Sequence, residues 1–251
     1  MEERKIKING LEVHFIIGSG EKGHLLILHG WGSKSERWQK TAEILEENNV
    51  AAVIPDLPGF GVSQDPAKPW SSADYVSFVD AFAKTIGLNS FYLLGHSFGG
   101  QLAIKYTLNF PHKVKALFLV AAACLRKKTL RKRLLLGVSK LFGYFPFFPF
   151  YSLFRKAVYR FFIKSDYLHV KGVMRETYLN VIKEDLAEYL PKIKKPTTII
   201  WGDSDDVTPI DQARVINSKI KNSKLVIIRG QNHDIERQAP EILARRILEN
   251  L

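Results

Sequence analysis

Cysteine is nearly absent from the sequence. Cys124 is the only one in 251 residues, so no disulfide can form within the chain. It follows the apolar run from Ala116 to Ala123, which predicts a buried thiol rather than a nucleophile, because a cysteine nucleophile needs a partner histidine and a suitable turn. No apolar run reaches the length that spans a bilayer, and residues 1–5, MEERK, lack the hydrophobic core of a signal peptide. We therefore expect a cytoplasmic protein.

Internal repeats and low-complexity tracts are also missing, as are His, Cys, Asp and Glu clusters at metal-ligand spacing. We therefore expect neither a metal nor a cofactor. What is present is apolar: 46% of the residues are hydrophobic and 12% are aromatic. This composition excludes a disordered chain and predicts a folded α/β domain with a sizeable core.

The positive charge is unevenly distributed along the chain. The formal net charge is +12, and residues 126–195 hold 17 Lys and Arg against 5 Asp and Glu. The rest of the chain has 20 of each sign, so the whole excess belongs to this segment. We expect no nucleic-acid partner, since the charge is confined to one internal segment. A solvated basic face and a weak association with an anionic membrane surface both remain open.

Hydrophobic patterning predicts strands that alternate with helices. Two alternating segments flank Asn9-Gly10, which is a hairpin signal, and five continuous apolar runs have the pattern of strands buried on both faces. These runs are residues 25–28, 50–54, 116–120, 197–201 and 224–228, and a sixth, 91–94, precedes a glycine-rich turn. Helical spacing lies between them, so we predict a doubly wound, mostly parallel sheet.

Between residues 125 and 190 the strand pattern stops and apolar residues recur at helical spacing. Two apolar stripes, Leu130 to Leu141 and Leu153 to Phe162, flank a Phe- and Pro-rich connection over residues 143–150. We predict a helical cap at 125–190, inserted into a core made of 1–124 and 191–251. Phe145 and Phe148 in the connection are candidates for lining a substrate pocket.

The segment Gly95-His96-Ser97-Phe98-Gly99-Gly100 follows a predicted strand and begins a predicted helix. This is the context of a GxSxG nucleophile elbow, in which glycines let strand and helix pass closely and the serine hydroxyl is exposed. A turn whose serine only caps the helix is the alternative. Either way, helix-start N–H groups point toward Ser97.

Other chemically suggestive residues also follow predicted strands, and in a parallel sheet such loops share one edge. Asp203, Asp205 and Asp206 follow residues 197–201, and His233 follows 224–228. The order serine, acid, histidine is that of the α/β-hydrolases. The chain resembles an α/β-hydrolase of the serine esterase and lipase branch over nearly its whole length. The resemblance rests on the motifs LHGWG at 28–32, DLPGFG at 56–61, GHSFGG at 95–100, the stretch 201–209, and Asn232-His233.

This resemblance implies roles for individual residues. Ser97 would be the nucleophile, His233 its base, and Asp205 the carboxylate that orients the imidazole, since Asp205 fits the family's GxxDxxxP spacing from Gly202 to Pro209. Asp203 and Asp206 are the alternatives for the acid. Thr208 is expected to cap the next helix. The backbone N–H groups of Trp31 and Phe98 would form the oxyanion hole.

The remaining polar residues near these motifs receive plainer interpretations. His29 and His96 flank the motifs and are expected to serve loop and turn packing, although both, with Gly30 and Trp31, are also candidates for the substrate pocket. Asp56 precedes the nucleophile in the chain and is interpreted as a turn-former.

We expect a serine hydrolase that cleaves carboxylic esters with small to medium acyl or aromatic groups. A serine at the elbow argues against the dehalogenases and epoxide hydrolases that share the expected fold. A C–C bond hydrolase, a lactonase, a thioesterase, a ligand receptor and a basic membrane-surface protein with little turnover remain alternatives. The partner would be a small-molecule ester, and the oligomeric state is left open.

Overall fold

The computed structural model describes residues 1–126 and 172–251. The chain divides into two compact units, one of residues 1–125 and 172–251 and the other of residues 126–171. Both apolar stripes of the predicted cap, and the pocket candidates Phe145 and Phe148, lie outside the described residues. From the predicted cap the structure describes residues 125–126 and 172–190. The second stretch groups with the first unit and includes helix α6 (Gly172–Val181).

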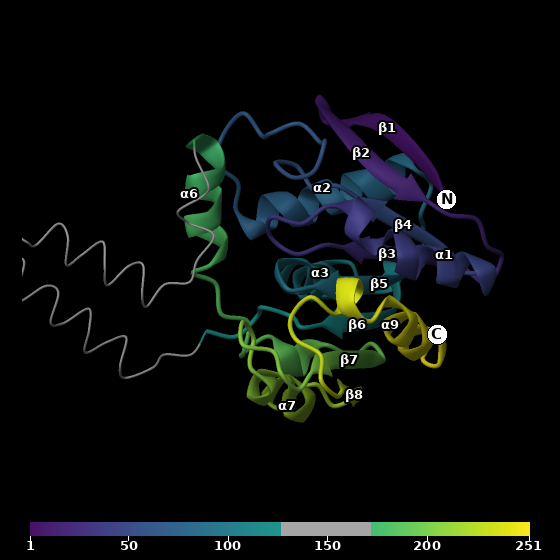
Figure 1. Ribbon diagram of the computed structural model, residues 1–251. Helices are drawn as coiled ribbons and strands as arrows, with labels where there is room; N and C mark the ends of the chain where they lie inside the picture. Colours follow the sequence, from purple (N-terminus) through teal and green to yellow (C-terminus); the bar gives the residue numbers. More distant parts are fainter. Residues whose placement is uncertain (127–171) are drawn as a thin grey trace, which may run out of the picture. The chain divides into compact units, whose positions relative to one another are not determined.

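Eight strands form one sheet in the order β1-β2-β4-β3-β5-β6-β7-β8 (Figure 1). The pairings β1–β2 and β2–β4 are antiparallel, and every pairing from β4 to β8 is parallel. The strands are β1 (Glu2–Ile8), β2 (Leu11–Ile17), β3 (His24–Leu28), β4 (Ala51–Pro55), β5 (Phe91–His96), β6 (Val114–Val120), β7 (Thr197–Gly202) and β8 (Ser223–Ile228). The expected doubly wound, mostly parallel sheet is confirmed.

The hairpin at the antiparallel edge follows directly from two residues. Asn9 and Gly10 have φ values of 48° and 86°, and Ile8 pairs with Leu11 across them. A two-residue turn with positive φ at both positions matches the twist of the flanking strands, and Asn-Gly adopts it at little cost. The turn therefore fixes the register of β1 on β2.

Helices cover both faces of the sheet. The described helices are η1 (Ser35–Trp38), α1 (Gln39–Glu47), α2 (Ser72–Thr85), α3 (Phe98–Asn109), η2 (Pro111–Lys113), α6, η4 (Leu190–Lys192), α7 (Ile210–Lys219), α8 (Ile235–Gln238) and α9 (Pro240–Leu248). Helices α1 and α9 contact each other and bury Leu45 and Leu243 against Ile27 and Leu94 of the sheet. Helices α2 and α3 contact each other, and Phe82 of α2 meets Phe15 of β2 on the opposite face.

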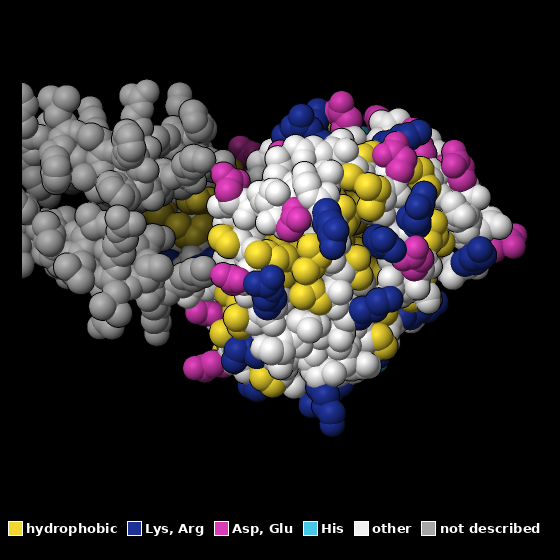
Figure 2. All heavy atoms as spheres, turned by 60° about the horizontal axis from the view of Figure 1, so that its bottom comes forward, with side chains coloured by type: hydrophobic (Ala, Val, Ile, Leu, Met, Phe, Trp, Pro, Cys, Tyr) yellow, Lys and Arg dark blue, Asp and Glu magenta, His cyan; other side chains and the backbone are white. Residues whose placement is uncertain are grey.

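The described surface is mixed in charge. On the face in Figure 2, basic and acidic side chains are interspersed over the coloured residues. This agrees with a balanced charge outside residues 126–195. Among the helices in the described ranges, none is long and apolar enough to cross a bilayer.

Candidate active site

Ser97 lies in the turn between β5 and α3, with a strained backbone. Its φ is 52° and its ψ is −115°, a conformation that an L-residue adopts at a cost of about 1–3 kcal/mol. The side chain makes no capping hydrogen bond to helix α3, so the alternative in which Ser97 only caps the helix is not what the structure has. Its hydroxyl instead lies 2.9 Å from a ring nitrogen of His233.

The glycines around Ser97 are required by close backbone contacts. A Cβ atom on Gly95 would lie closer than 3.0 Å to the backbone of Gly99, and one on Gly99 would meet the carbonyl of Leu28 equally closely. Real Cβ atoms do not approach other atoms at such distances. The glycines thus let β3, β5 and the start of α3 pass together, which leaves Ser97 at the end of the sheet.

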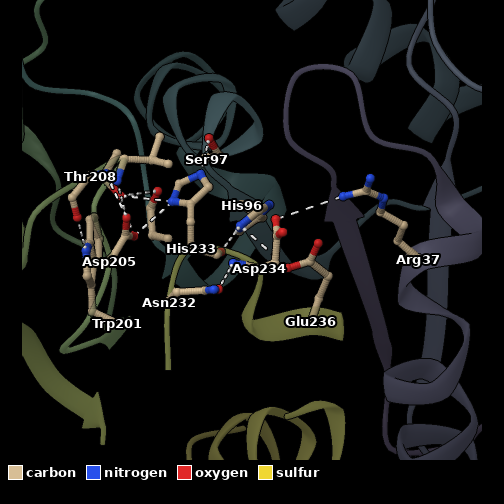
Figure 3. Close-up of polar contacts among 12 residues, drawn as sticks. Arg37, His96, Ser97, Trp201, Asp205, Thr208, Asn232, His233, Asp234 and Glu236 are labelled. Carbon is tan, nitrogen blue, oxygen red and sulfur yellow. Dashed lines mark hydrogen bonds and ion pairs between the residues drawn. The ribbon is translucent and has the colours of Figure 1, made fainter. Parts of the chain in front are cut away.

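Ser97, His233 and Asp205 come together from three separate loops (Figure 3). His233 Nε2 is 2.9 Å from Ser97 Oγ, and His233 Nδ1 is 2.8 Å from Asp205 Oδ2. The carboxylate is an acceptor only, so it fixes the proton on Nδ1 and leaves the Nε2 lone pair facing the hydroxyl. This is the arrangement in which an imidazole can take a proton from serine.

The Asp205 side chain is 0% exposed, and the loop around it supplies its hydrogen bonds. The backbone N–H groups of Val207 and Thr208 donate to Oδ1, and the Thr208 hydroxyl donates to Oδ2 at 2.8 Å. Burial raises the pKa of Asp205, but the hydrogen bonds from His233 and Thr208 outweigh it and hold the pKa below its ordinary value. Asp205 is therefore a carboxylate at neutral pH.

The other two acids in this loop are exposed at the surface. Asp203 accepts hydrogen bonds from the Gly230 N–H and from the Ser204 hydroxyl, so it ties two loops together. The prediction for Thr208 was wrong: helix α7 begins at Ile210 and has no side-chain cap. The Thr208 hydroxyl holds Asp205 instead, because its short side chain points back into the loop.

The loop after β3 passes close to Ser97. A Cβ atom on Gly30 would lie 3.2 Å from Ser97 Cβ, which shows how closely the loop after β3 passes the serine. The next residue, Trp31, stacks edge-on against Phe98 with ring centroids 5.4 Å apart. In the described part of the chain, neither the Trp31 N–H nor the Phe98 N–H donates a hydrogen bond.

The pocket candidate His29 is fully buried and joins two loops. Its Nδ1–H donates to the Gly30 carbonyl at 2.8 Å, and its Nε2 accepts from the Leu57 N–H at 3.0 Å. Burial lowers the pKa of His29 to about 4, so the ring is neutral. Asp56 binds the same region through the Ser35 and Val62 N–H groups. We assign both residues to the scaffold of the site.

An aromatic wall, made of Trp31, Phe60, Phe98 and Tyr178, stands next to the serine. Trp31 is its centre, with ring centroids 4.8 Å from Phe60 and 5.0 Å from Tyr178 of α6. The Trp70 N–H donates to Thr177 Oγ1 at 2.9 Å, which fastens α6 to the loop before α2. Apolar rings that line a binding site favour apolar ligand groups.

Three features of the site were not predicted from the sequence: the Thr208 contact, the short helix α8 and the contact between His96 and the His233 loop. Each depends on a loop path rather than on a motif, and a short polar loop carries no periodic signal. Among the residues that the structure describes, no group of His, Cys, Asp or Glu could hold a metal ion.

Comparison with known families identifies the family of the chain. Residues 19–238 match the model of the family described as "Serine aminopeptidase, S33", a group of α/β-hydrolases. The chain belongs to this family. The match covers all three residues that meet at the site, together with the loops that hold them.

Individual relatives share between 26% and 29% of their aligned residues with the chain. The monoacylglycerol lipase ABHD6 of Mus musculus is 26% identical over 257 aligned residues, covering 92% of this chain and 76% of the relative. Lipase 1 of Psychrobacter immobilis is 29% identical over 234 residues, covering 83% and 70%. The crystal structure of a membrane phospholipase A, described as a bacterial virulence factor, superposes with a TM-score of 0.75 at 26% identity and covers 99% of this chain and 84% of its own.

Proposed function

We propose that the protein is a serine hydrolase that cleaves carboxylic esters through an acyl-enzyme intermediate. The observation that carries the proposal is the continuous chain of contacts from buried Asp205 through His233 to Ser97 Oγ, at 2.8 and 2.9 Å. The names of the relatives, which include a monoacylglycerol lipase, a lipase and a phospholipase, support ester substrates.

The chemistry follows from the proton positions. His233 Nε2 takes the proton of Ser97 as Oγ attacks the ester carbonyl, and the imidazolium that forms faces the Asp205 carboxylate. The developing oxyanion accepts hydrogen bonds from the Trp31 and Phe98 N–H groups, and one such donor contributes about 3 kcal/mol in other hydrolases. His233 then protonates the leaving alcohol, and a water molecule releases the acid by the same steps.

The aromatic wall bears on the substrate class. The backbone N–H groups of Trp31 and Phe98 would bind the oxyanion, and the side chains of the same two residues belong to the aromatic wall. The acyl group of an ester whose carbonyl is bound there would therefore lie beside apolar rings. Acyl chains of medium length and aromatic acyl groups should therefore bind better than acetyl. Glycerol monoesters are a natural case to test, given the monoacylglycerol lipases among the relatives.

The test is a hydrolysis screen of p-nitrophenyl esters of increasing acyl length, with a glycerol monoester, a lactone, a thioester and a meta-cleavage product included. Ser97→Ala is the matched control, and an acyl p-nitroanilide tests amide cleavage. We expect Ser97-dependent release of p-nitrophenol with an optimum above acetate. Turnover of the C–C substrate or of the amide, with no turnover of any ester, would contradict the proposal. Ester turnover that survives in Ser97→Ala would contradict it too.

A further inference from the structure

His96, the residue before the nucleophile, makes contacts that the proposed mechanism does not use. Its side chain is buried, and its Nε2 lies 3.0 Å from the backbone carbonyl of His233 (Figure 3). The two imidazole rings are 5.1 Å apart. A Cβ atom on Gly30 would lie 3.1 Å from His96 Nδ1, so the other edge of the ring faces the loop that leads to Trp31. The ring thus separates the two loops that flank Ser97.

The neighbours of His96 fix where its proton lies. Nε2 faces a carbonyl oxygen at 3.0 Å and the Oε2 atom of Glu236 at 3.7 Å, and both are acceptors. Nε2 must therefore carry the proton. Nδ1 is buried and has no hydrogen-bond partner within the described ranges, which agrees with a bare lone pair there. Burial is the largest effect and lowers the pKa of His96. The charges of Glu236 and Asp234 and the hydrogen bond to the His233 carbonyl act to raise it, whereas the charge of His233 lowers it.

Glu236, on helix α8, is the second unexplained group. Its side chain is 0% exposed, and neither carboxylate oxygen has a hydrogen-bond partner in the part of the chain described. Removing a carboxylate from water without such partners is energetically unfavourable. Its charged contact is with His96 Nε2 at 3.7 Å, and it also lines a pocket together with Arg37 and Arg237. Arg37 also reaches this loop, but its guanidinium lies 3.9 Å from Asp234.

We propose that His96 is a positioning residue, whose Nε2–H holds the main chain of His233 in place, and that Glu236 keeps the proton of His96 on that nitrogen. The proposal rests on the proposed function, since the catalytic geometry is what is being held. Two carboxylate–histidine pairs then act on one base: Asp205 orients the ring of His233, and Glu236 acts through His96 on its backbone.

The experiment compares His96→Leu with His96→Gln. Leucine removes the donor, whereas the glutamine amide NH₂ occupies roughly the place of Nε2 and can still donate to the His233 carbonyl. In His96→Leu the His233 loop loses its hydrogen bond, and a misplacement of about 1 Å can reduce turnover about 100-fold. We expect kcat for a p-nitrophenyl ester to fall between about 10-fold and 100-fold with KM within about 2-fold, and His96→Gln to recover kcat to within about 3-fold of the parent.

Two outcomes would overturn the proposal. A His96→Leu variant as active as the parent would show that the contact is not needed. If both variants fold and are equally defective, the donated hydrogen bond is not what matters, because glutamine can donate it and leucine cannot. Packing of the imidazole ring would then be the cause.

A measurement without turnover keeps this test separate from the proposed function. Histidine ¹⁵N spectra of the parent should show His96 protonated at Nε2 and bare at Nδ1, and an Nδ1–H tautomer would overturn the proposal. Glu236→Gln should lower the pKa of His96, because the attraction to a carboxylate is lost. An unchanged pKa would remove Glu236 from the proposal. If the parent hydrolyses no ester, the proposed function fails while these spectra still decide the placement of the proton.

Discussion

Two aspartate–histidine pairs lie in the described unit, and one of them reaches a serine hydroxyl. Asp56 follows β4 and Asp205 follows β7, and both carboxylates are buried. His14 Nδ1 lies 3.1 Å from Asp56, as His233 Nδ1 lies 2.8 Å from Asp205. The second ring nitrogen differs: in His14 it faces the exposed Glu3 at 3.5 Å, whereas in His233 it faces Ser97.

The difference shows that an aspartate–histidine pair by itself has a structural role. It can transfer a proton only when a third group, such as a hydroxyl, lies within hydrogen-bond distance of the histidine. Asp56 accepts from the Ser35 and Val62 N–H groups as well as facing His14, so its charge stabilises loops. Asp205 also accepts from loop N–H groups, yet its histidine turns the remaining lone pair to a hydroxyl. The two pairs can be told apart by experiment.

The largest effect is expected from the group that distinguishes the pairs. Ser97→Ala and His233→Ala should each lower kcat/KM for esters about 1000-fold or more, because nucleophile and base act as a unit. His14→Ala is the matched control and should change it less than about 3-fold. Circular dichroism checks that each variant is folded. Equal losses in the His14 and His233 variants would abolish the distinction between the two pairs.

The second test replaces the carboxylate of each pair by an amide. Asp205→Asn should lower kcat about 1000-fold, since the amide favours the wrong tautomer of His233. Asp56→Asn should leave kcat within about 10-fold but reduce the free energy of unfolding by about 1–3 kcal/mol, because the amide oxygen replaces only one of the two carboxylate oxygens that accept from the Ser35 and Val62 N–H groups. Steady-state kinetics and urea unfolding measure the two effects. Asp203→Asn is a further control, and a severe loss there would move the acid to Asp203.

His29, which follows β3, belongs to neither pair and makes both of its side-chain hydrogen bonds to the backbone. Its pKa of about 4 lies below the ordinary value of 6.5. As the pH falls below 6.5, His29 becomes protonated in the unfolded chain but stays neutral in the folded chain. The stabilisation is therefore complete above pH 6.5 and decreases toward pH 4. Between about pH 7 and about pH 5 the free energy of unfolding should drop by about 2 kcal/mol from this group. In His29→Gln the drop should shrink by that amount; an unchanged pH dependence would contradict the assignment.

The smallest effect concerns the loop that supports Asp205. Thr208→Val removes the hydroxyl that donates to Oδ2, one of the contacts that keep the carboxylate charged, and should lower kcat about 10-fold. Thr208→Ser keeps the donor and should stay within about 2-fold. If valine and serine variants behave alike, the hydroxyl has no part in holding the acid.

The sequence by itself determined the strands of the sheet and supplied the residues that we propose to react. Apolar runs and Asn9-Gly10 predicted the strands and the hairpin, because periodicity and turn residues act over a few positions. The GHSFGG segment predicted the turn at Ser97, since close backbones admit no other residue than glycine at positions such as Gly95. The choice of Asp205 over Asp203 and Asp206 followed from the resemblance to the family's GxxDxxxP spacing, and the burial of Asp205 agrees with it.

Only the tertiary structure decided how the loops serve one another. Thr208 has the residue type and position of a helix cap, yet its hydroxyl turns to Asp205 because α7 begins two residues later. His96 and Glu236 lie far apart in the sequence and meet where the end of β5 reaches α8, so no local pattern relates them. Contacts between distant loops depend on the strand order, and strand order is set by packing of the whole sheet rather than by any segment of it.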